Sequence, residues 1–298
     1  MKYDLLPEFQ KYSWIQMPVQ PVLLKAANRF MPVIQHGRRL DSRLLSKTIH
    51  FGEFTAKLIR PKDREIDAVL IYYHGGAFVL KAAAYHKNLA QTYALQANCA
   101  VLFVDYRLAP KYKFPVPVMD CFEAYCWALE NFPSSRLAVG GDSAGADLAM
   151  SVMLMARNKG KRMPDGQMLI YPGAASHSDT VSMQRFQDTP MWNSVLNEKA
   201  LDLYANREDR DDPLFMPLLA DSFSGFPPAY VETAEFDCLH DAGIQIAERY
   251  RADGIEVILN ETAHTMHGYD IAENSPYVKE QARKRISFLM GIFEQGGI

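Results

Sequence analysis

The chain has 298 residues, 48% of them hydrophobic and 22% charged, which is typical of a globular protein with one large core. A net charge of −3 without a basic run gives no reason to expect nucleic acid as a partner. No apolar stretch is long enough to span a membrane, and we expect no signal peptide. The four cysteines lack the spacing of a disulfide framework or a metal site, so we expect a cytoplasmic protein.

From about residue 47, short apolar segments alternate with helical patterns. We expect strands at 66–73, 99–104, 137–139, 167–171, 228–233 and 256–259, and helices at 89–98, 117–131, 240–252 and 276–294. A further apolar helical pattern begins at Ala146. Apolar strands separated by helices predict a mostly parallel sheet with helices on both faces.

Two long segments do not fit this alternation. Residues 1–45 have apolar residues at helical spacing, and residues 176–225 are polar and irregular. Both are too long for simple connections, so we interpret them as two parts of a mainly helical cap over the strand ends. The core then comprises residues 46–175 and 226–298. We expect aromatic residues of the second segment to form an apolar pocket: Phe186, Trp192, Tyr204 and Phe215. A packing arm without a functional role is the alternative for the first segment.

A serine lies among small residues at one predicted strand-to-helix junction. The sequence Gly141-Asp142-Ser143-Ala144-Gly145 joins the apolar strand 137–139 to the helical pattern that begins at Ala146. Small residues two positions before and after the serine allow the strand and helix to pass closely. This pattern is typical of a nucleophile elbow, which exposes the serine hydroxyl at a helix N-terminus. An ordinary glycine-rich turn is the alternative.

A serine nucleophile needs a base and a carboxylate that orients the base. His267 follows the last predicted strand, at the same sheet edge as Ser143, and is the best candidate among eight histidines; His264 is its neighbouring competitor. Asp237 follows the strand 228–233 and is the candidate acid, although it could simply cap a helix. Asp241 and Glu235 are alternatives. The order Ser143, Asp237, His267 is that of an α/β-hydrolase.

The reaction also needs donors for the negative oxygen of a tetrahedral intermediate. His74-Gly75-Gly76-Ala77-Phe78 directly follows the strand 66–73. The N–H groups of Gly75 and Gly76 can turn toward a point shared with the N–H of Ala144. Residues that flank these loops are expected to contact the substrate: Phe78, His74 and Asp142.

These motifs together resemble the hormone-sensitive-lipase-like family of α/β-hydrolases, which includes bacterial carboxylesterases. The matching segments are His74–Phe78, Asp105-Tyr106-Arg107-Leu108-Ala109-Pro110, Phe114-Pro115, Gly141–Gly145, the block from Asp237 to Asp241, and His267-Gly268-Tyr269. The resemblance implies an α/β-hydrolase fold, the triad of Ser143, Asp237 and His267, and an oxyanion hole from Gly76, Ala77 and Ala144. It also implies a lid made of the N-terminal segment and a central insertion, and no cofactor.

The chain departs from the family pattern at three positions. Ala77 stands where a third glycine is common, Cys238 where proline usually follows the triad aspartate, and Ala146 where glycine is common. None of these changes removes a catalytic group. We therefore expect a serine carboxylesterase for small, short-acyl esters. A formamidase or other amide hydrolase with the same triad is an alternative, and so is a ligand-binding protein without turnover. A homodimer is possible.

Overall fold

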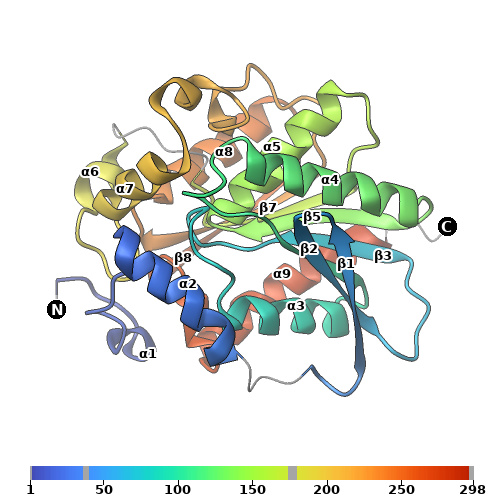
Figure 1. Ribbon diagram of the computed structural model, residues 1–298, viewed down its shortest axis with the longest axis horizontal. Helices are drawn as coiled ribbons and strands as arrows, with labels where there is room; N and C mark the ends of the chain where they lie inside the picture. The colour runs from blue at the N-terminus through green and yellow to red at the C-terminus, as the bar shows by residue number, and fades with distance from the viewer. Residues whose placement is uncertain (1, 36–39, 174–179, 295–298) are drawn as a thin grey trace.

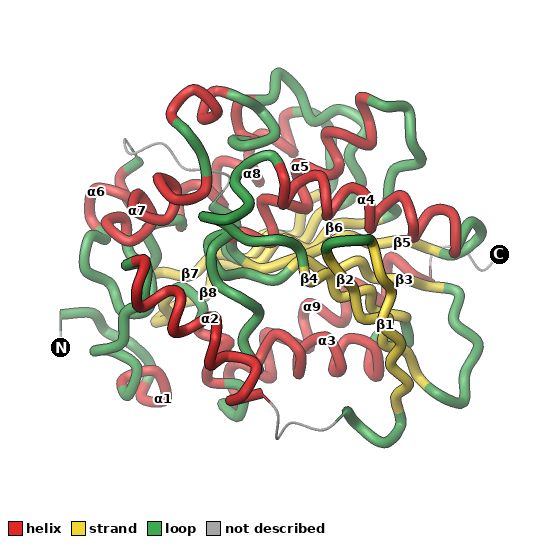
Figure 2. The backbone as a smooth tube through the Cα atoms, in the orientation of Figure 1, coloured by secondary structure: helices red, strands yellow, loops and turns green. Residues whose placement is uncertain are grey.

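The computed structural model describes residues 2–35, 40–173 and 180–294, and these contain one eight-stranded sheet (Figures 1 and 2). Its strand order is β1-β2-β4-β3-β5-β6-β7-β8. The strands from β3 to β8 are parallel, whereas β1 and β2 form an antiparallel hairpin at one edge, next to β4. The strands are β1 (Leu44–Phe51), β2 (Phe54–Pro61), β3 (Ala68–Tyr73), β4 (Ala100–Asp105), β5 (Arg136–Asp142), β6 (Gly166–Ile170), β7 (Ala229–Phe236) and β8 (Val257–Met266).

Helices cover both faces of the sheet. The helices α3 and α9 lie on one face and α4, α5 and α8 on the other (Figure 1). The helices are α1 (Pro7–Gln10), α2 (Pro21–Gln35), α3 (Ala84–Gln96), α4 (Val116–Asn131), α5 (Ala144–Asn158), α6 (Val181–Arg185), α7 (Ser194–Tyr204), α8 (His240–Ala252) and α9 (Pro276–Glu294). Short 3-10 turns lie at Arg207–Asp211, Pro217–Leu219 and Tyr269–Ala272.

The inner strands are almost entirely buried because they have helices above and below. Every residue of β3 is buried, and so is every residue of β6. Continuous burial removes the alternation of polar and apolar residues that a sheet with one wet face would show. The predicted parallel sheet with helices on both faces is confirmed, and it brings the carboxyl ends of β3, β5, β7 and β8 to one edge.

The sequence prediction was wrong about the two edges of the sheet. The hairpin of β1 and β2 was not predicted, because β1 carries exposed polar residues such as Ser46 and Lys47. The strand β8 continues to Met266, seven residues beyond its predicted end at 259. Its second half is polar and partly exposed because β8 has a neighbour on one side alone, so its sequence is similar to that of a loop.

The N-terminal segment and the segment after β6 contact each other. Gln16 forms a bridge with Met191, and the N–H of Met17 donates to the Met191 carbonyl at 3.0 Å. Figure 1 shows α2, α6 and α7 at the same end of the molecule. The sheet begins at Leu44, within the segment predicted as cap, and part of the other segment, 176–179, lies outside the described residues. The division into core and cap stays a prediction.

Candidate active site

Ser143 lies at the turn between β5 and α5, with a backbone conformation that only a tight junction imposes. Its φ of 53° and ψ of −126° are unusual for a residue with a side chain. Glycine is required on both sides of it. A Cβ on Gly141 or on Gly145 would overlap the carbonyl of Tyr73 at the end of β3. The close approach of β3, β5 and α5 therefore depends on both glycines, and it leaves the Ser143 hydroxyl at the carboxyl edge of the sheet.

Three side chains from separate strand ends form one hydrogen-bonded chain. The Ser143 hydroxyl lies 2.9 Å from Nε2 of His267, and Nδ1 of His267 lies 2.7 Å from an Asp237 carboxylate oxygen. Asp237 is fully buried and also accepts the N–H of Leu239 at 2.9 Å. The arrangement holds the imidazole with Nε2 toward the serine, which is the orientation that a general base requires.

The alternative residues lie elsewhere. His264 is exposed, and its ring contacts the carbonyl of Asp4. Asp241 accepts the N–H of Ser182 at 2.8 Å, and Glu235 accepts the N–H of His264. The structure therefore brings Asp237 and His267 to Ser143, and it does not bring these three residues there.

The loop after β3 presents two backbone N–H groups beside Ser143. Within the described part of the chain, the N–H groups of Gly76, Ala77 and Ala144 have no acceptor. The N–H of Gly75, which we also expected in the hole, donates to Asp142 at 3.1 Å and is therefore satisfied. Ala77 and Phe78 both have positive φ values, 52° and 63°, so this loop is strained at two residues other than glycine.

The Asp142 carboxylate holds the loop after β3 in place through hydrogen bonds. Its carboxylate accepts the Tyr72 hydroxyl at 2.7 Å and the Gly75 N–H, and it contacts Nε2 of His86 at 2.8 Å. Burial acts to raise the pKa of the Asp142 carboxyl, but His86 and the Tyr72 hydroxyl outweigh burial and hold that pKa below its usual value. Asp142 lines the cavity beside Ser143, with its carboxylate already occupied by these partners.

His74, which we expected to contact substrate, does not line that cavity. Its ring is buried and stacks on Tyr106, 4.5 Å away between ring centres. Burial, together with the neighbouring His86, lowers the pKa of His74 to about 3, so its imidazole is neutral. Nδ1 then donates to the carbonyl of Gly75 at 2.6 Å, which fixes the peptide that leads into Gly76.

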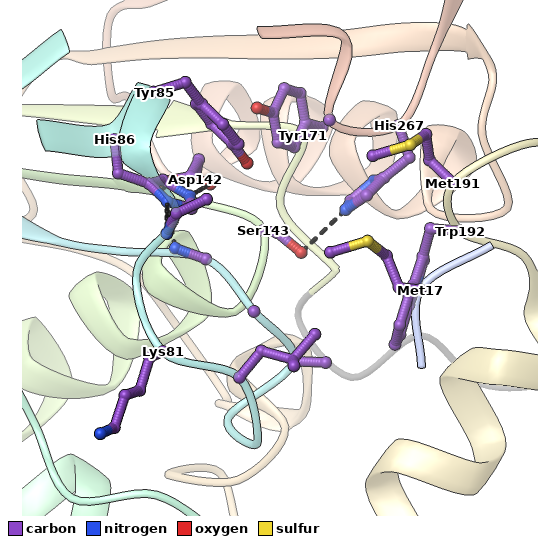
Figure 3. A pocket seen from close by; sticks show the side chains of 16 residues that line it. Met17, Lys81, Tyr85, His86, Asp142, Ser143, Tyr171, Met191, Trp192 and His267 are labelled. Carbon is purple, nitrogen blue, oxygen red and sulfur yellow. Dashed lines mark hydrogen bonds and ion pairs between the residues drawn. The ribbon is translucent and has the colours of Figure 1, made fainter. Parts of the chain in front are cut away.

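Two cavities meet at Ser143, and Trp192 lines both. Figure 3 shows the larger of them, with Trp192 and His267 beside Ser143. The larger cavity has a volume of about 60 Å³, and its walls include Met17, Tyr85 and Tyr171. The smaller has about 20 Å³, and its walls include Phe78 and Leu201. Of the four cap aromatics expected in a pocket, Trp192 alone lines either cavity. The other three are buried among neighbouring rings: Phe186, Tyr204 and Phe215.

Sequence reasoning missed Met17, Tyr85 and Tyr171 as wall residues. They come from the N-terminal segment, the start of α3 and the end of β6. Tyr171 directly follows a buried strand at the carboxyl edge of the sheet, and that position is the signal that could have found it. Met17 and Tyr85 have no comparable signal in the sequence.

A fully buried ionic cluster of Arg285, Glu232 and Asp270 lies next to Tyr171, whose ring packs near His267. Arg285 of α9 binds Glu232 of β7 and contacts both carboxylate oxygens of Asp270, at 3.0 and 3.1 Å. The Tyr171 hydroxyl donates to Asp270 at 2.8 Å, and the Tyr171 ring lies 4.8 Å from the His267 ring. Burial acts to raise the pKa of Glu232, but Arg285 outweighs it and lowers that pKa; for Asp270 burial prevails and the pKa is raised.

The described residues contain no cluster of three or more His, Cys, Asp or Glu side chains that could hold a metal ion, and no helix long and apolar enough to span a membrane. The site thus combines a serine on a strand-to-helix elbow, a histidine and a carboxylate in hydrogen-bonded order, and free backbone donors beside them. This is the arrangement typical of serine hydrolases with the α/β-hydrolase fold.

Comparison with known proteins agrees with this class. The model of the α/β-hydrolase fold family matches residues 70–271, and the chain belongs to this family. It is 35% identical over 234 residues to carboxylic ester hydrolase LipN of Mycobacterium tuberculosis, covering 73% of this chain and 61% of LipN. It is 36% identical over 203 residues to hormone-sensitive lipase of Bos taurus, covering 65% of this chain and 26% of the lipase. The solved structure of a bacterial heroin esterase superposes with a TM-score of 0.89 at 27% identity, covering 99% and 100% of the two chains.

The matched region is therefore less than two thirds of LipN and about a quarter of the lipase. The resemblance to hormone-sensitive-lipase-like α/β-hydrolases that the motifs indicated is confirmed at the level of the family.

Proposed function

We propose that this protein is a serine carboxylesterase that hydrolyses small esters with a short acyl chain. The observation that carries the proposal is the unbroken chain of hydrogen bonds from Ser143 through His267 to Asp237, at 2.9 and 2.7 Å. The names of a relative and of a solved neighbour, a carboxylic ester hydrolase and a heroin esterase, support ester rather than amide bonds as the target.

In the proposed reaction, the hydroxyl oxygen of Ser143 attacks the ester carbonyl carbon while His267 takes the hydroxyl proton. The N–H groups of Gly76, Ala77 and Ala144 donate to the carbonyl oxygen, which becomes negative in the tetrahedral intermediate. Asp237 stabilises the imidazolium that forms. The carbon–oxygen bond to the alcohol then breaks, and His267 gives its proton to the departing oxygen. Water, deprotonated by His267, attacks the acyl-serine in the same way and releases the acid.

The cavity sizes support a small substrate. We assign the acyl group to the cavity of about 20 Å³ and the alcohol to the cavity of about 60 Å³. A water molecule needs roughly 10–15 Å³ on the same scale, so the smaller cavity accommodates only a group of a few atoms. The apolar walls of both cavities match apolar acyl and alcohol groups.

The test is a series of initial rates on p-nitrophenyl esters from acetyl to dodecanoyl. We expect the rate to peak at the shortest chains, and to vanish in Ser143→Ala while the protein stays folded. Labelling of Ser143 by a serine-directed phosphonate in a 1:1 ratio is expected as well. Turnover that survives Ser143→Ala contradicts the proposal. Turnover of p-nitroacetanilide that exceeds that of p-nitrophenyl acetate assigns the triad to amides instead.

A second variant tests the assignment of the acyl side. Leu201 lines the smaller cavity and is nearly buried. Leu201→Ala removes three carbon atoms from its wall, and we expect the preferred acyl chain to lengthen. Met17→Ala, in the larger cavity, is the matched control and is expected to change the preference for the alcohol. If Met17→Ala, and not Leu201→Ala, comes to prefer longer acyl chains, the acyl group belongs in the larger cavity and the alcohol in the smaller.

We also propose a cytoplasmic location and a homodimer. All four cysteines are free, and three of them are buried, which supports a reducing compartment.

The proposed homodimer would form through the edge of the sheet. The strand β8 lies at this edge with Ile258 half exposed, so a second copy could pair with it. Light scattering of wild type and of Ile258→Lys tests the dimer, which the variant is expected to dissociate.

A further inference from the structure

Helix α2 exposes large apolar side chains to solvent. Val22 is 80% exposed, Leu23 52% and Phe30 58%, and Trp14, seven residues before the helix, is 80% exposed. Each successive residue turns about 100° around a helix, so Val22, Ala26 and Phe30 fall on one stripe with Leu23 at its edge. Contiguous exposed apolar side chains of this kind are typical of a surface that binds a partner or a membrane.

The same helix carries positive charge beside the stripe. Lys25 and Arg29 lie on the flank next to Val22, and both are exposed. Neither has an acidic partner among the residues that the structure describes. The sequence from Phe9 to Leu40 contains no Asp or Glu, although the whole chain has 35. The N-terminal segment is therefore basic in a protein with a net charge of −3.

The basic surface continues onto the core. A cavity of about 960 Å³ beside α2 is lined by Lys25, Lys81 and Lys111, while Asp105 is the one carboxylate among the described residues that line it. Lys87 and Arg107 also line it, although the charge of Arg107 is paired with Asp120 and Glu53. Figure 3 shows the Lys81 side chain directed away from Ser143, and Figure 1 shows α2 on the outside of the molecule.

The opposite side of α2 is hydrogen-bonded to the chain that follows the loop of Gly76 and Ala77. The Asn28 amide donates to the carbonyl of Val79 at 2.7 Å and accepts the N–H of Lys81 at 2.9 Å. Leu24, on the same side, is buried. The helix is therefore docked through one face next to the loop that follows Gly76, and its apolar and basic stripes face outward together.

We propose that α2 binds the surface of an anionic lipid bilayer, lying in the interface with Val22, Leu23 and Phe30 among the acyl chains and Lys25 and Arg29 at the headgroups. An apolar stripe flanked by cations is the pattern that such interfacial helices share. Charge complementarity favours this occupant over a second copy of the chain. A symmetric dimer through α2 would bring like charges together in a segment without acidic residues.

The test is flotation of the full-length protein with vesicles, either of phosphatidylcholine or of an equimolar mixture with phosphatidylglycerol. We expect binding to the mixed vesicles that weakens as salt is added. Removing one cation lowers such binding roughly 5-fold, so Lys25→Glu with Arg29→Glu is expected to lower it about 25-fold or more. Phe30→Ser is expected to lower it about tenfold.

The matched controls lie on α7, a neighbouring helix. Val195 is 44% exposed and Lys199 is exposed. Val195→Ser and Lys199→Glu therefore replace an exposed apolar residue by serine and an exposed cation by glutamate at another surface. Both are expected to bind vesicles like wild type. All variants are expected to hydrolyse soluble p-nitrophenyl acetate equally, which shows that they are folded and separates this test from that of the proposed function.

Three results would overturn the proposal. The first is that wild type does not bind the mixed vesicles. The second is that the α7 controls lose as much vesicle binding as the α2 variants. The third is that wild type binds both kinds of vesicle equally and the charge reversals have no effect. A self-association that Phe30→Ser abolishes, without any vesicle binding, would assign the stripe to a second copy.

Discussion

Replacing Arg285 by methionine tests whether the buried ionic cluster positions the catalytic histidine. Methionine keeps an unbranched apolar stem but removes the guanidinium group, with its charge and its donors. Glu232 and Asp270, both buried, then lose their shared partner. Asp270 follows His267 by three residues and holds the Tyr171 hydroxyl at 2.8 Å, so disorder in the cluster reaches the wall of the catalytic site.

Removal of one partner from a buried ion pair costs about 3–5 kcal/mol, because the remaining charge stays buried and unpaired. The total free energy of unfolding of a domain is about 5–15 kcal/mol, so Arg285→Met is expected to remain folded with a much lower urea midpoint. A displacement of a catalytic group by ~1 Å lowers turnover about 10²-fold, and we expect a fall in kcat of up to that size. KM is expected to change little, since Arg285 lines neither cavity at Ser143.

The assay combines urea unfolding with kcat and KM on p-nitrophenyl acetate, measured where each variant is fully folded. Arg283→Met, an exposed position on the same helix, is the control and is expected to resemble wild type. Arg285→Lys keeps the charge without the guanidinium fork, and we expect intermediate values for both quantities. If Arg285→Met unfolds at the same urea concentration as Arg283→Met, the reasoning about the buried charges is refuted. A loss of stability with unchanged kcat would refute the positioning of His267.

Three further predictions concern the site itself. Asp237→Asn is expected to lower kcat about 10⁴-fold with little change in KM, because the amide cannot stabilise the imidazolium; steady-state kinetics check this, and a tenfold loss or less would contradict it. Ala77→Gly relieves about 1–2 kcal/mol of left-handed strain but adds about 0.5–1 kcal/mol of unfolded-state freedom. A net gain in unfolding free energy of about 0–1.5 kcal/mol is therefore expected from urea unfolding, and a clear loss would show that Ala77 is not strained. The pKa of Asp142 is lowered by folding, so its ionised form adds stability above its unfolded pKa of about 3.9, and this is lost as the pH falls through the lower folded pKa. Wild type should therefore lose more stability than Asp142→Asn on acidification below about pH 4, and parallel urea midpoints would argue against it.

Much of the fold could be predicted because its inner elements carry strong local patterns. The strands β3 to β7 are almost entirely buried and mostly apolar, and each was found near its observed place. Ser143, Asp237 and His267 could be singled out because each follows a strand at the sheet edge where parallel strands end together. The hairpin of β1 and β2 was missed because an edge position lets polar residues occupy a strand.

The candidate site was predicted less completely where contacts join distant segments. Met17 reaches the cavity because the N-terminal segment bonds to Met191, and no local pattern announces that pairing. His74 was expected to contact substrate, but its lowered pKa and its stacking on Tyr106 depend on neighbours that only folding supplies.

The sequence by itself determined the alternation of inner strands and helices, the elbow at Ser143 and the side-chain chemistry at the sheet edge. These follow from hydrophobic periodicity and from small residues at fixed spacing. The tertiary structure alone decided which amides stay free beside Ser143, how large the two cavities are, and that Arg285 neutralises carboxylates behind His267. Each of these properties depends on several contacts between residues far apart in the chain. Those contacts, and the burial that strengthens them, exist only after the chain has folded.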